Sequence, residues 1–270
     1  MKKVILVTGA SAGMGKVMAQ LLAENGFIVY GAARRLEKMK DLEPLGVHTL
    51  KMDVTDETSM AAGIDTIISQ EGQIDVLVNN AGFGSYGAIE EVPLKDARYQ
   101  LEVNVFGAAR LIQLVLPHMR ARHSGKIVNI SSIGGKVSMP LGGWYHASKF
   151  ALEAISDALR NEVRQFGIDV VVIEPGGVKS EWADIAVGNG LKNSGNGAYK
   201  EMTSKFAGLQ KTFGHRAAEP LVIAKIVLKA IRARHPRTRY SAGFMAGPVL
   251  TMKKILPDRL LDRVLLSQLQ

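Results

Sequence analysis

The sequence predicts one α/β domain in which helices cover both faces of a doubly wound parallel sheet. Three observations lead to this fold class. Short apolar runs, several of them rich in Val and Ile, alternate with longer stretches of helical period. The runs are nearly continuous in their apolar character, as expected of parallel strands that are buried on both faces. A glycine-rich turn follows the first run, where Rossmann-like folds place the turn that binds phosphate.

The order of the runs and helical stretches defines the expected elements. We expect strands at 4–7, 27–30, 47–52, 74–78, 126–130 and 168–173, and a last strand near 238–242. The helical stretches between them include 17–25, 58–70, 93–119 and 147–165. Such alternation is typical of βαβ units with right-handed crossovers, so it predicts a parallel sheet.

Two segments stand outside this alternation. Residues 180–215 are polar and rich in glycine, so we expect a flexible lid over the substrate that has no packed core of its own. Residues 244–270 are expected to form a C-terminal helical extension. No repeat, low-complexity tract or linker divides the chain, and residues 1–270 are therefore predicted to form a single domain.

The composition excludes several kinds of site. The 270 residues contain no Cys, which excludes disulfides, thiolate nucleophiles and sulfur-ligated metals. The histidines His118, His123 and His146 lack the spacing of paired metal ligands, and we expect no metal site. No apolar segment approaches the roughly 20 residues that span a bilayer, and the first run is too short for a signal peptide. A cytoplasmic protein without an integral membrane segment is expected.

The net charge of +9 is concentrated near the C-terminus, where residues 225–270 contain ten Lys or Arg and two Asp. A basic segment raises the question of a nucleic acid or an anionic membrane as partner. No nucleic-acid motif accompanies these charges, so we expect a solvated helix face and no nucleic-acid partner. Within this segment an apolar stripe is formed by Leu260, Leu261, Val264 and Leu265. We expect the stripe to pack on protein, near the substrate pocket or a subunit interface, with peripheral membrane contact as the alternative.

The turn after the first apolar run reads Thr8-Gly9-Ala10-Ser11-Ala12-Gly13-Met14-Gly15 and opens an amphipathic helix. Glycines at this place let the backbone approach a pyrophosphate, and the helix N-terminus offers free N–H groups. The spacing Thr-Gly-x-x-x-Gly-x-Gly resembles the short-chain dehydrogenase/reductase family. Three further motifs stand in the family's order between residues 3 and 242: Asn79-Asn80-Ala81-Gly82, Tyr145-His146-Ala147-Ser148-Lys149 and Pro175-Gly176. Their details resemble the members that act on hydroxysteroids and retinol.

The resemblance implies a compact oxidoreductase that transfers hydride between a nicotinamide dinucleotide and a carbonyl or alcohol. Asp53 would hydrogen-bond the adenine amino group, and Pro175 to Val178 would contact the nicotinamide end. The residues implied in cofactor binding are Gly9, Ser11, Gly13, Met14, Gly15, Arg34, Asp53, Val54, Asn80, Ala81, Gly82, Tyr145, Lys149, Pro175, Gly176 and Val178.

The end of the second predicted strand indicates which dinucleotide is bound. Enzymes that use NAD usually hold the ribose 2′-OH with an acidic residue at this place. Here the acid position is Ala33, and Arg34 follows it. Since the Arg guanidinium presents several donors suited to a phosphate, the sequence favours NADP(H) over NAD(H).

Four residues form the predicted catalytic set. Tyr145 and Lys149 lie four apart and share a helix face. Ser132 lies thirteen residues before Tyr145, the spacing that the family uses, and Asn104 matches the family's fourth member. Tyr145 would act as general acid or base, with Lys149 favouring its phenolate and Ser132 orienting the substrate oxygen. The resemblance implies that Asn104 holds a water that connects Lys149 to solvent.

The side chains expected to border the nicotinamide are mostly large and apolar, which favours a bulky apolar substrate such as a steroid, a retinoid or another ketone. They are Phe83, Tyr86, Met139, Leu141, Trp144 and Trp182. The alternative function is a catalytically silent dinucleotide-sensing protein of the same fold, against which the intact catalytic set argues. A homodimer or homotetramer is expected.

Overall fold

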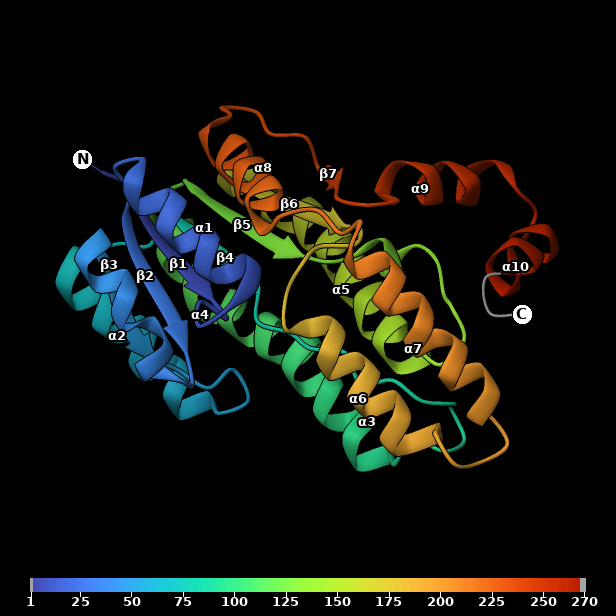
Figure 1. Ribbon diagram of the computed structural model, residues 1–270. Helices are drawn as coiled ribbons and strands as arrows, with labels where there is room; N and C mark the ends of the chain where they lie inside the picture. Colours follow the sequence, from blue (N-terminus) through green and yellow to red (C-terminus); the bar gives the residue numbers. More distant parts are fainter. Residues whose placement is uncertain (1, 268–270) are drawn as a thin grey trace.

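Seven parallel strands form one sheet, in the order β3-β2-β1-β4-β5-β6-β7, within residues 2–267, the part of the chain that the computed structural model describes (Figure 1). The strands are β1 Val4–Thr8, β2 Ile28–Ala33, β3 Val47–Lys51, β4 Val76–Asn79, β5 Gly125–Ile130, β6 Ile168–Pro175 and β7 Arg239–Ala242. The predicted doubly wound parallel sheet is confirmed. Strand order reverses between β1 and β4, and ligands of such sheets bind in the crevice at this reversal.

Helices cover both faces of the sheet because alternate strand residues point to opposite sides. On one face, Ile5 and Val7 of β1 pack with α1 and α8; on the other, Val4 and Leu6 pack with α2, α4 and α5. The helices of the two layers are α1 Gly13–Glu24 and α8 Pro220–Arg232, and α2 Glu57–Glu71, α4 Gly107–Ala121 and α5 Gly143–Val163. All four of these β1 side chains are at most 1% exposed, which explains why the apolar run is continuous.

Short helical segments join several of these elements. They are the 3-10 helices η1 Leu36–Leu45, η3 Ile133–Gly135 and η4 Arg164–Phe166. The predicted helix 93–119 is divided into α3 Leu94–Leu101, the π-helical turn η2 Glu102–Phe106, and α4. A π-helical turn interrupts helical period by one residue and often marks a functional site, and here it carries Asn104.

The segment predicted as a flexible lid is mostly helical, and the expectation that it lacks a packed core is wrong. It contains α6 Trp182–Ser194 and α7 Lys200–Gly214, which pack against each other. Ala186 and Phe206 are buried between these helices and the loop after β4. The many small and polar residues did not prevent packing, because positions such as Gly190 face the partner helix: a Cβ there would be in ordinary contact with Thr203 and Phe206 of α7.

The chain after β7 forms α9 Ala246–Ile255 and α10 Asp258–Leu266, which project to one side of the sheet (Figure 1). Leu261 and Leu265 of the predicted stripe are buried against Val137 and Val249. Half of the stripe therefore packs on this chain, beside the loop that follows β5, whereas Leu260 is 44% exposed. Residues 268–270 of the predicted extension, like residue 1, lie outside the described residues. Between residues 2 and 267 no helix is long and apolar enough to cross a membrane.

Candidate active site

The glycine-rich turn lies at the reversal of strand order and is shaped for close backbone approach. Gly9 has a positive φ of 69°, and a Cβ there would come within 2.9 Å of the Asn80 side chain. A Cβ on Gly15 would lie 2.3 Å from the Gly9 carbonyl oxygen, so only glycine lets α1 begin this close to β1. The structure thus provides a glycine turn and a helix N-terminus without a side-chain cap, as a pyrophosphate site requires.

Hydrogen bonds hold this turn to the end of β4. The Thr8 hydroxyl accepts bonds from the backbone N–H groups of Asn80 and Ala81, both at 3.0 Å. The Asn80 side chain in turn donates to the Thr8 carbonyl at 2.9 Å. The predicted cofactor residues Asn80 and Ala81 therefore fix the position of the glycine-rich turn.

Asp53, the predicted adenine contact, makes a local interaction in the structure. One oxygen of its carboxylate accepts hydrogen bonds from the Thr55 N–H at 3.0 Å and the Thr55 hydroxyl at 2.8 Å. Helix α2 is capped by Asp56, as its place in the sequence suggests. Asp53 is thus not needed as the cap, and its second carboxylate oxygen makes no hydrogen bond within residues 2–267.

The two arginines after β2 take different directions, which the sequence could not show. Arg34 donates to the Tyr99 hydroxyl at 2.7 Å. Arg35 turns toward the glycine-rich turn, where its Nη2 lies 3.4 Å from the Ser11 hydroxyl and 3.2 Å from the Glu181 carboxylate. Lys38 also contacts Glu181, at 3.6 Å.

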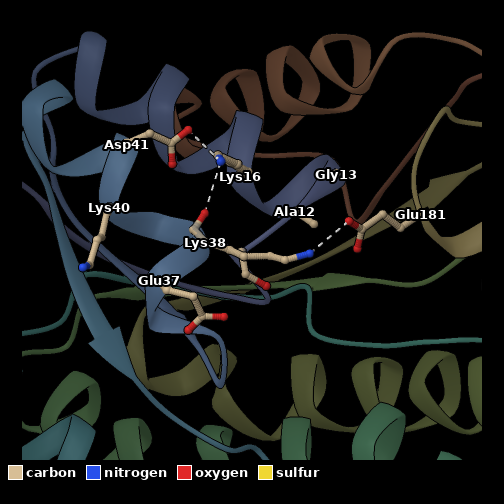
Figure 2. A pocket seen from close by; sticks show the side chains of 9 residues that line it. Ala12, Gly13, Lys16, Glu37, Lys38, Lys40, Asp41 and Glu181 are labelled. Atoms are coloured by element: carbon tan, nitrogen blue, oxygen red, sulfur yellow. Dashed lines mark hydrogen bonds and ion pairs between the residues drawn. The ribbon is translucent and has the colours of Figure 1, made fainter.

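Lys38 and Glu181 border a hollow next to the glycine-rich turn, and its charged lining is mixed: three lysines, Lys16, Lys38 and Lys40, and three acids, Glu37, Asp41 and Glu181. Its volume is about 590 Å³, and its lining includes Ser11, Lys16, Lys38 and Glu181 (Figure 2). Sequence analysis named Ser11 but missed Arg35, Lys38 and Glu181 as members of this region. The adjacent pair Arg34-Arg35 in the sequence was a clue to Arg35, whereas only the tertiary fold brings Lys38 and Glu181 to this region.

At the carboxyl end of β5 the structure brings together the predicted catalytic side chains. Ser132 directly precedes η3, and its Oγ accepts a hydrogen bond from Gly134 N at 3.0 Å. Tyr145 and Lys149 project from the first turns of α5, with the Lys149 nitrogen 6.0 Å from the centre of the Tyr145 ring. Lys149 also donates to the Ile130 carbonyl at 2.9 Å, which fixes its position against the end of β5.

Burial shifts the acid–base properties of this pair. Tyr145 is 7% exposed, and desolvation raises the pKa of its phenol to about 12, although the neighbouring Ser132 hydroxyl acts in the opposite direction. Desolvation lowers the pKa of Lys149 to about 8, against the favourable charge of Glu153. The Tyr145 hydroxyl is therefore protonated at neutral pH, and the Lys149 ammonium loses its proton as the pH rises through about 8.

Asn104 is placed next to Lys149 by the π-helical turn. Its Oδ1 accepts from Phe83 N, and its Nδ2 lies 3.0 Å both from the Phe83 carbonyl and from the Ser148 hydroxyl. A Cβ on Gly82 would lie 3.1 Å from Asn104 Oδ1 and 3.6 Å from the Lys149 nitrogen. Gly82 therefore allows Asn104 and Lys149 to approach the same point.

The predicted nicotinamide-side residues follow β6. Gly176 donates to the Ala242 carbonyl at 2.8 Å, and a Cβ there would lie 2.2 Å from the Phe244 carbonyl oxygen. The Ser132 hydroxyl lies 3.5 Å from the Pro175 carbonyl, so the two loops meet beside Tyr145. Val178, just before the lid segment 180–215, forms a β-bridge with Ala218, just after it.

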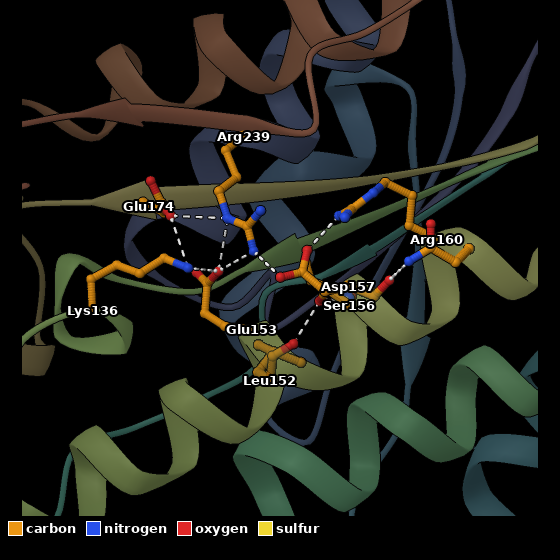
Figure 3. Close-up of polar contacts among 10 residues, drawn as sticks. Lys136, Leu152, Glu153, Ser156, Asp157, Arg160, Glu174 and Arg239 are labelled. Atoms are coloured by element: carbon orange, nitrogen blue, oxygen red, sulfur yellow. Dashed lines mark hydrogen bonds and ion pairs between the residues drawn. The ribbon is translucent and has the colours of Figure 1, made fainter. Parts of the chain in front are cut away.

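A buried ion cluster braces the helix that carries Tyr145 and Lys149 (Figure 3). Glu153 of α5 contacts Lys136 at 2.7 Å and Arg239 of β7 at 2.9 Å. Glu174, just before the nicotinamide-side loop, contacts the same two cations at 3.8 and 3.4 Å. The cluster thus joins the loop after Ser132, α5, β6 and β7, and sequence analysis missed it because its members are far apart along the chain.

Aromatic side chains cover Tyr145. The rings of Tyr86 and Trp182 lie 5.8 and 5.0 Å from the Tyr145 ring, and Phe206 of α7 stacks on Tyr86. Leu141 belongs to the same cluster. The other expected pocket residues are placed differently: Met139 packs toward the C-terminal helices, Phe83 contacts Tyr99, and the Trp144 indole nitrogen is buried.

His146, the neighbour of Tyr145, is also buried in this region. Its Nδ1 is 3.0 Å from the Gly134 carbonyl, while its Nε2 has no hydrogen-bond partner within residues 2–267. Burial lowers the pKa of His146, which favours the neutral ring.

Comparisons with known proteins point to one family. A family model described as short chain dehydrogenase matches residues 3–186. The chain is 36% identical to a 3-ketodihydrosphingosine reductase of Bacteroides thetaiotaomicron, over 97% of this chain and 96% of that protein. It is also 36% identical to an NADPH-dependent 3-dehydrocapnine reductase of Ornithobacterium rhinotracheale, over 98% of this chain and 96% of that protein.

Similarity extends to a steroid enzyme and to a solved structure. Human 17-beta-hydroxysteroid dehydrogenase type 1 is 32% identical, over 93% of this chain and 81% of its own length. The crystal structure of a short-chain dehydrogenase from Streptomyces avermitilis superposes with a TM-score of 0.81 at 35% identity, covering 93% of this chain and 91% of that one. The resemblance drawn from the sequence motifs is thereby confirmed.

Proposed function

Because this chain belongs to the short-chain dehydrogenase family, we propose that it is an NADP(H)-dependent oxidoreductase that interconverts a ketone and a secondary alcohol on a large apolar substrate. The observation that carries this proposal is the convergence of Ser132, Tyr145 and Lys149 beside the loop that follows β6. The glycine-rich turn and the neighbouring cations fit a phosphorylated dinucleotide. When bound, the dinucleotide supplies or accepts the hydride.

The chain's own residues would manage the proton and the developing charge. Reduction of a ketone leaves an alkoxide oxygen, and the Tyr145 hydroxyl gives its proton to that oxygen. The Lys149 ammonium stabilises the phenolate that results, since an opposite charge nearby favours the ionised form. The Ser132 hydroxyl donates a hydrogen bond to the substrate oxygen and holds it in line with Tyr145. Oxidation of an alcohol runs through the same atoms in reverse.

The preference for NADP(H) is supported by charge at the end of β2. The position at the end of β2 where NAD enzymes usually carry an acid is Ala33, and Arg34 and Arg35 follow it directly, with Lys38 one turn further along. Cations in this place would bind a 2′-phosphate, which NAD lacks. The NADPH dependence in the name of the 3-dehydrocapnine reductase agrees with this preference.

The apolar substrate is supported by the side chains around Tyr145. Tyr86, Leu141, Trp182 and Phe206 offer large apolar surfaces and few polar groups. The names of the two reductases at 36% identity, 3-ketodihydrosphingosine reductase and 3-dehydrocapnine reductase, each point to an oxidised carbon 3 in the substrate. We propose a ketone carried on a long apolar chain as the first substrate class to test, ahead of compact steroids.

Turnover with a panel of ketones, followed by NADPH consumption, tests this function. In the best substrate of the panel, Tyr145→Phe is expected to lower kcat by about 100- to 10,000-fold, the usual cost of losing a positioned acid. Its Kd for NADPH should change little, because the ring and the backbone stay in place. Tyr240→Phe removes a tyrosine hydroxyl of β7 that accepts a hydrogen bond from Arg237 N, and it serves as control. Near-normal turnover in Tyr145→Phe would refute the assigned acid, whereas tight NADPH binding without turnover of any ketone would favour a dinucleotide sensor.

A further inference from the structure

The lid begins with a carboxylate that lies among the cations next to the phosphate turn. Glu181 directly precedes α6, and its carboxylate contacts Arg35 at 3.2 Å. The same carboxylate contacts Lys38 at 3.6 Å (Figure 2). Arg35 also reaches the Ser11 hydroxyl of the glycine-rich turn. The Glu181 carboxylate therefore forms ion pairs with two side chains, Arg35 and Lys38, of the segment after β2.

The same stretch of chain crosses the phosphate turn. A Cβ on Gly13 would lie 3.1 Å from the Ser180 side chain, so residues 180 and 181 pass directly over the N-terminus of α1. The contacts between Glu181 and its two cations hold the pKa of its carboxyl below the ordinary value, and the group is charged at neutral pH. Arg35, Lys38 and Glu181 are all about half exposed, so their ion pairs are weak and open readily.

The residue after Glu181 contacts the proposed catalytic acid. The Trp182 ring lies 5.0 Å from Tyr145 and 5.7 Å from Tyr86, and its atoms fill the space above Gly84. With Trp182 in this position, Tyr145 is only 7% exposed. Trp182 covers Tyr145 together with Tyr86 and Leu141, so a movement of Trp182 would widen the approach of a substrate ketone to the Tyr145 hydroxyl.

We propose that Glu181 is a latch that mimics the 2′-phosphate of the cofactor. Its carboxylate holds Arg35 and Lys38 while the 2′-phosphate is absent, and it keeps Trp182 on Tyr145. A 2′-phosphate competes for the same cations, displaces Glu181 and frees the first turn of α6. Access to Tyr145 is thereby coupled to the phosphate that distinguishes NADPH from NADH. This inference rests on the proposed NADP(H) function.

The physical reason for the coupling is charge competition. A phosphate carries more negative charge than a carboxylate and offers more acceptor oxygens, so it binds the Arg35 guanidinium better. NADH brings no group to this place, and Glu181 stays paired. Since a ligand shifts an equilibrium only by its differential affinity for the two states, only the 2′-phosphorylated cofactor should release the lid.

Binding measurements on Glu181→Gln test the competition. The amide has the size of the carboxylate but no charge, so Arg35 and Lys38 are free before the cofactor arrives. Exposed ion pairs contribute little, and the Kd for NADPH should therefore fall by about two- to fivefold, with less than a twofold change for NADH. Glu201→Gln is the matched control, because Glu201 forms an exposed pair with Lys205 on α7 and should alter neither Kd. Equal tightening for both cofactors, or no difference from Glu201→Gln, would overturn the latch.

Fluorescence tests the movement. The chain contains two tryptophans, and in a Trp144→Phe background the emission reports Trp182 alone. Adenosine 2′,5′-bisphosphate should change this emission and ADP should not, because only the first carries a 2′-phosphate. In Glu181→Gln the emission should already be shifted before ligand is added. An unchanged emission despite tight binding of the bisphosphate would refute the coupling.

The two failures are distinguishable. A wild-type enzyme that prefers NADPH, with an inactive Tyr145→Phe variant but no effect of Glu181→Gln, would leave the proposed function standing and remove the latch. A wild-type enzyme whose kcat/KM with NADH equals that with NADPH would refute the cofactor assignment on which the latch depends.

Discussion

Substitution of Arg34 by Ala should weaken NADPH binding selectively. A hydrogen bond to a charged group contributes about 1.5–3 kcal/mol. In the protein described here, Arg34 already donates to the Tyr99 hydroxyl at 2.7 Å, a bond that it would give up to bind a phosphate. The bond to Tyr99 also has a charged donor, but it is exposed to water, which replaces most of its contribution when it breaks. The net loss in the variant should therefore be about 1–2 kcal/mol. This corresponds to a five- to thirtyfold higher Kd for NADPH.

Titration of NADPH and NADH by cofactor fluorescence measures the effect. NADH has no 2′-phosphate, so its Kd should change by less than about twofold. Arg164→Ala removes an exposed arginine of η4 far from the cofactor turn along the chain and controls for general charge. Tyr99→Phe provides a test in the opposite direction, since it frees Arg34 and should tighten NADPH binding slightly. Equal weakening of both cofactors by Arg34→Ala would refute this reasoning and indicate a role in folding.

Two further predictions concern pH and the C-terminus. Lys149 is cationic below its pKa of about 8, so kcat/KM for ketone reduction should be flat from about pH 6 to 7.5 and fall as the pH rises through 8. Lys149→Arg should move this decline to higher pH, and a decline at the same pH in an active Lys149→Arg variant would exclude Lys149 as its origin. Deletion of residues 256–270 removes two buried leucines, Leu261 and Leu265. The deletion should lower the free energy of unfolding by about 3–6 kcal/mol, measured by urea titration. Unchanged stability and kinetics, together with lost binding to anionic vesicles, would instead favour membrane contact.

Much of the catalytic set was predictable because its spacing is local. Tyr145 and Lys149 share a helix face at four residues' separation, and any α-helix over this segment places them together. The glycine-rich turn was readable for a similar reason: Gly9 and Gly15 are required by contacts within one strand–turn–helix unit. Ser132 and Asn104 were assigned through family spacing, and no short-range rule would have brought them to Lys149.

The lid shows why composition was a poor guide. Glycine and polar residues lower intrinsic helix propensity, which led to the expectation of a flexible segment. In the fold, Ser194 lies buried and accepts from Ala88 N at 2.8 Å, and Asn193 donates to the Tyr86 carbonyl at 2.9 Å. These polar side chains satisfy the backbone of a loop more than 100 residues away. Tertiary partners therefore decide whether a polar residue stabilises a helix here.

The sequence by itself determined the parallel sheet, the phosphate turn and the Tyr145–Lys149 pair, because strand alternation, glycine geometry and helical period act over a few residues. Only the tertiary structure decided how Arg34 and Arg35 divide between Tyr99 and Glu181. It also decided that the stripe of α10 packs beside the loop after Ser132. Long side chains and amphipathic helices have many possible partners of equal chemistry, and the choice among them depends on which surfaces the rest of the chain brings within reach.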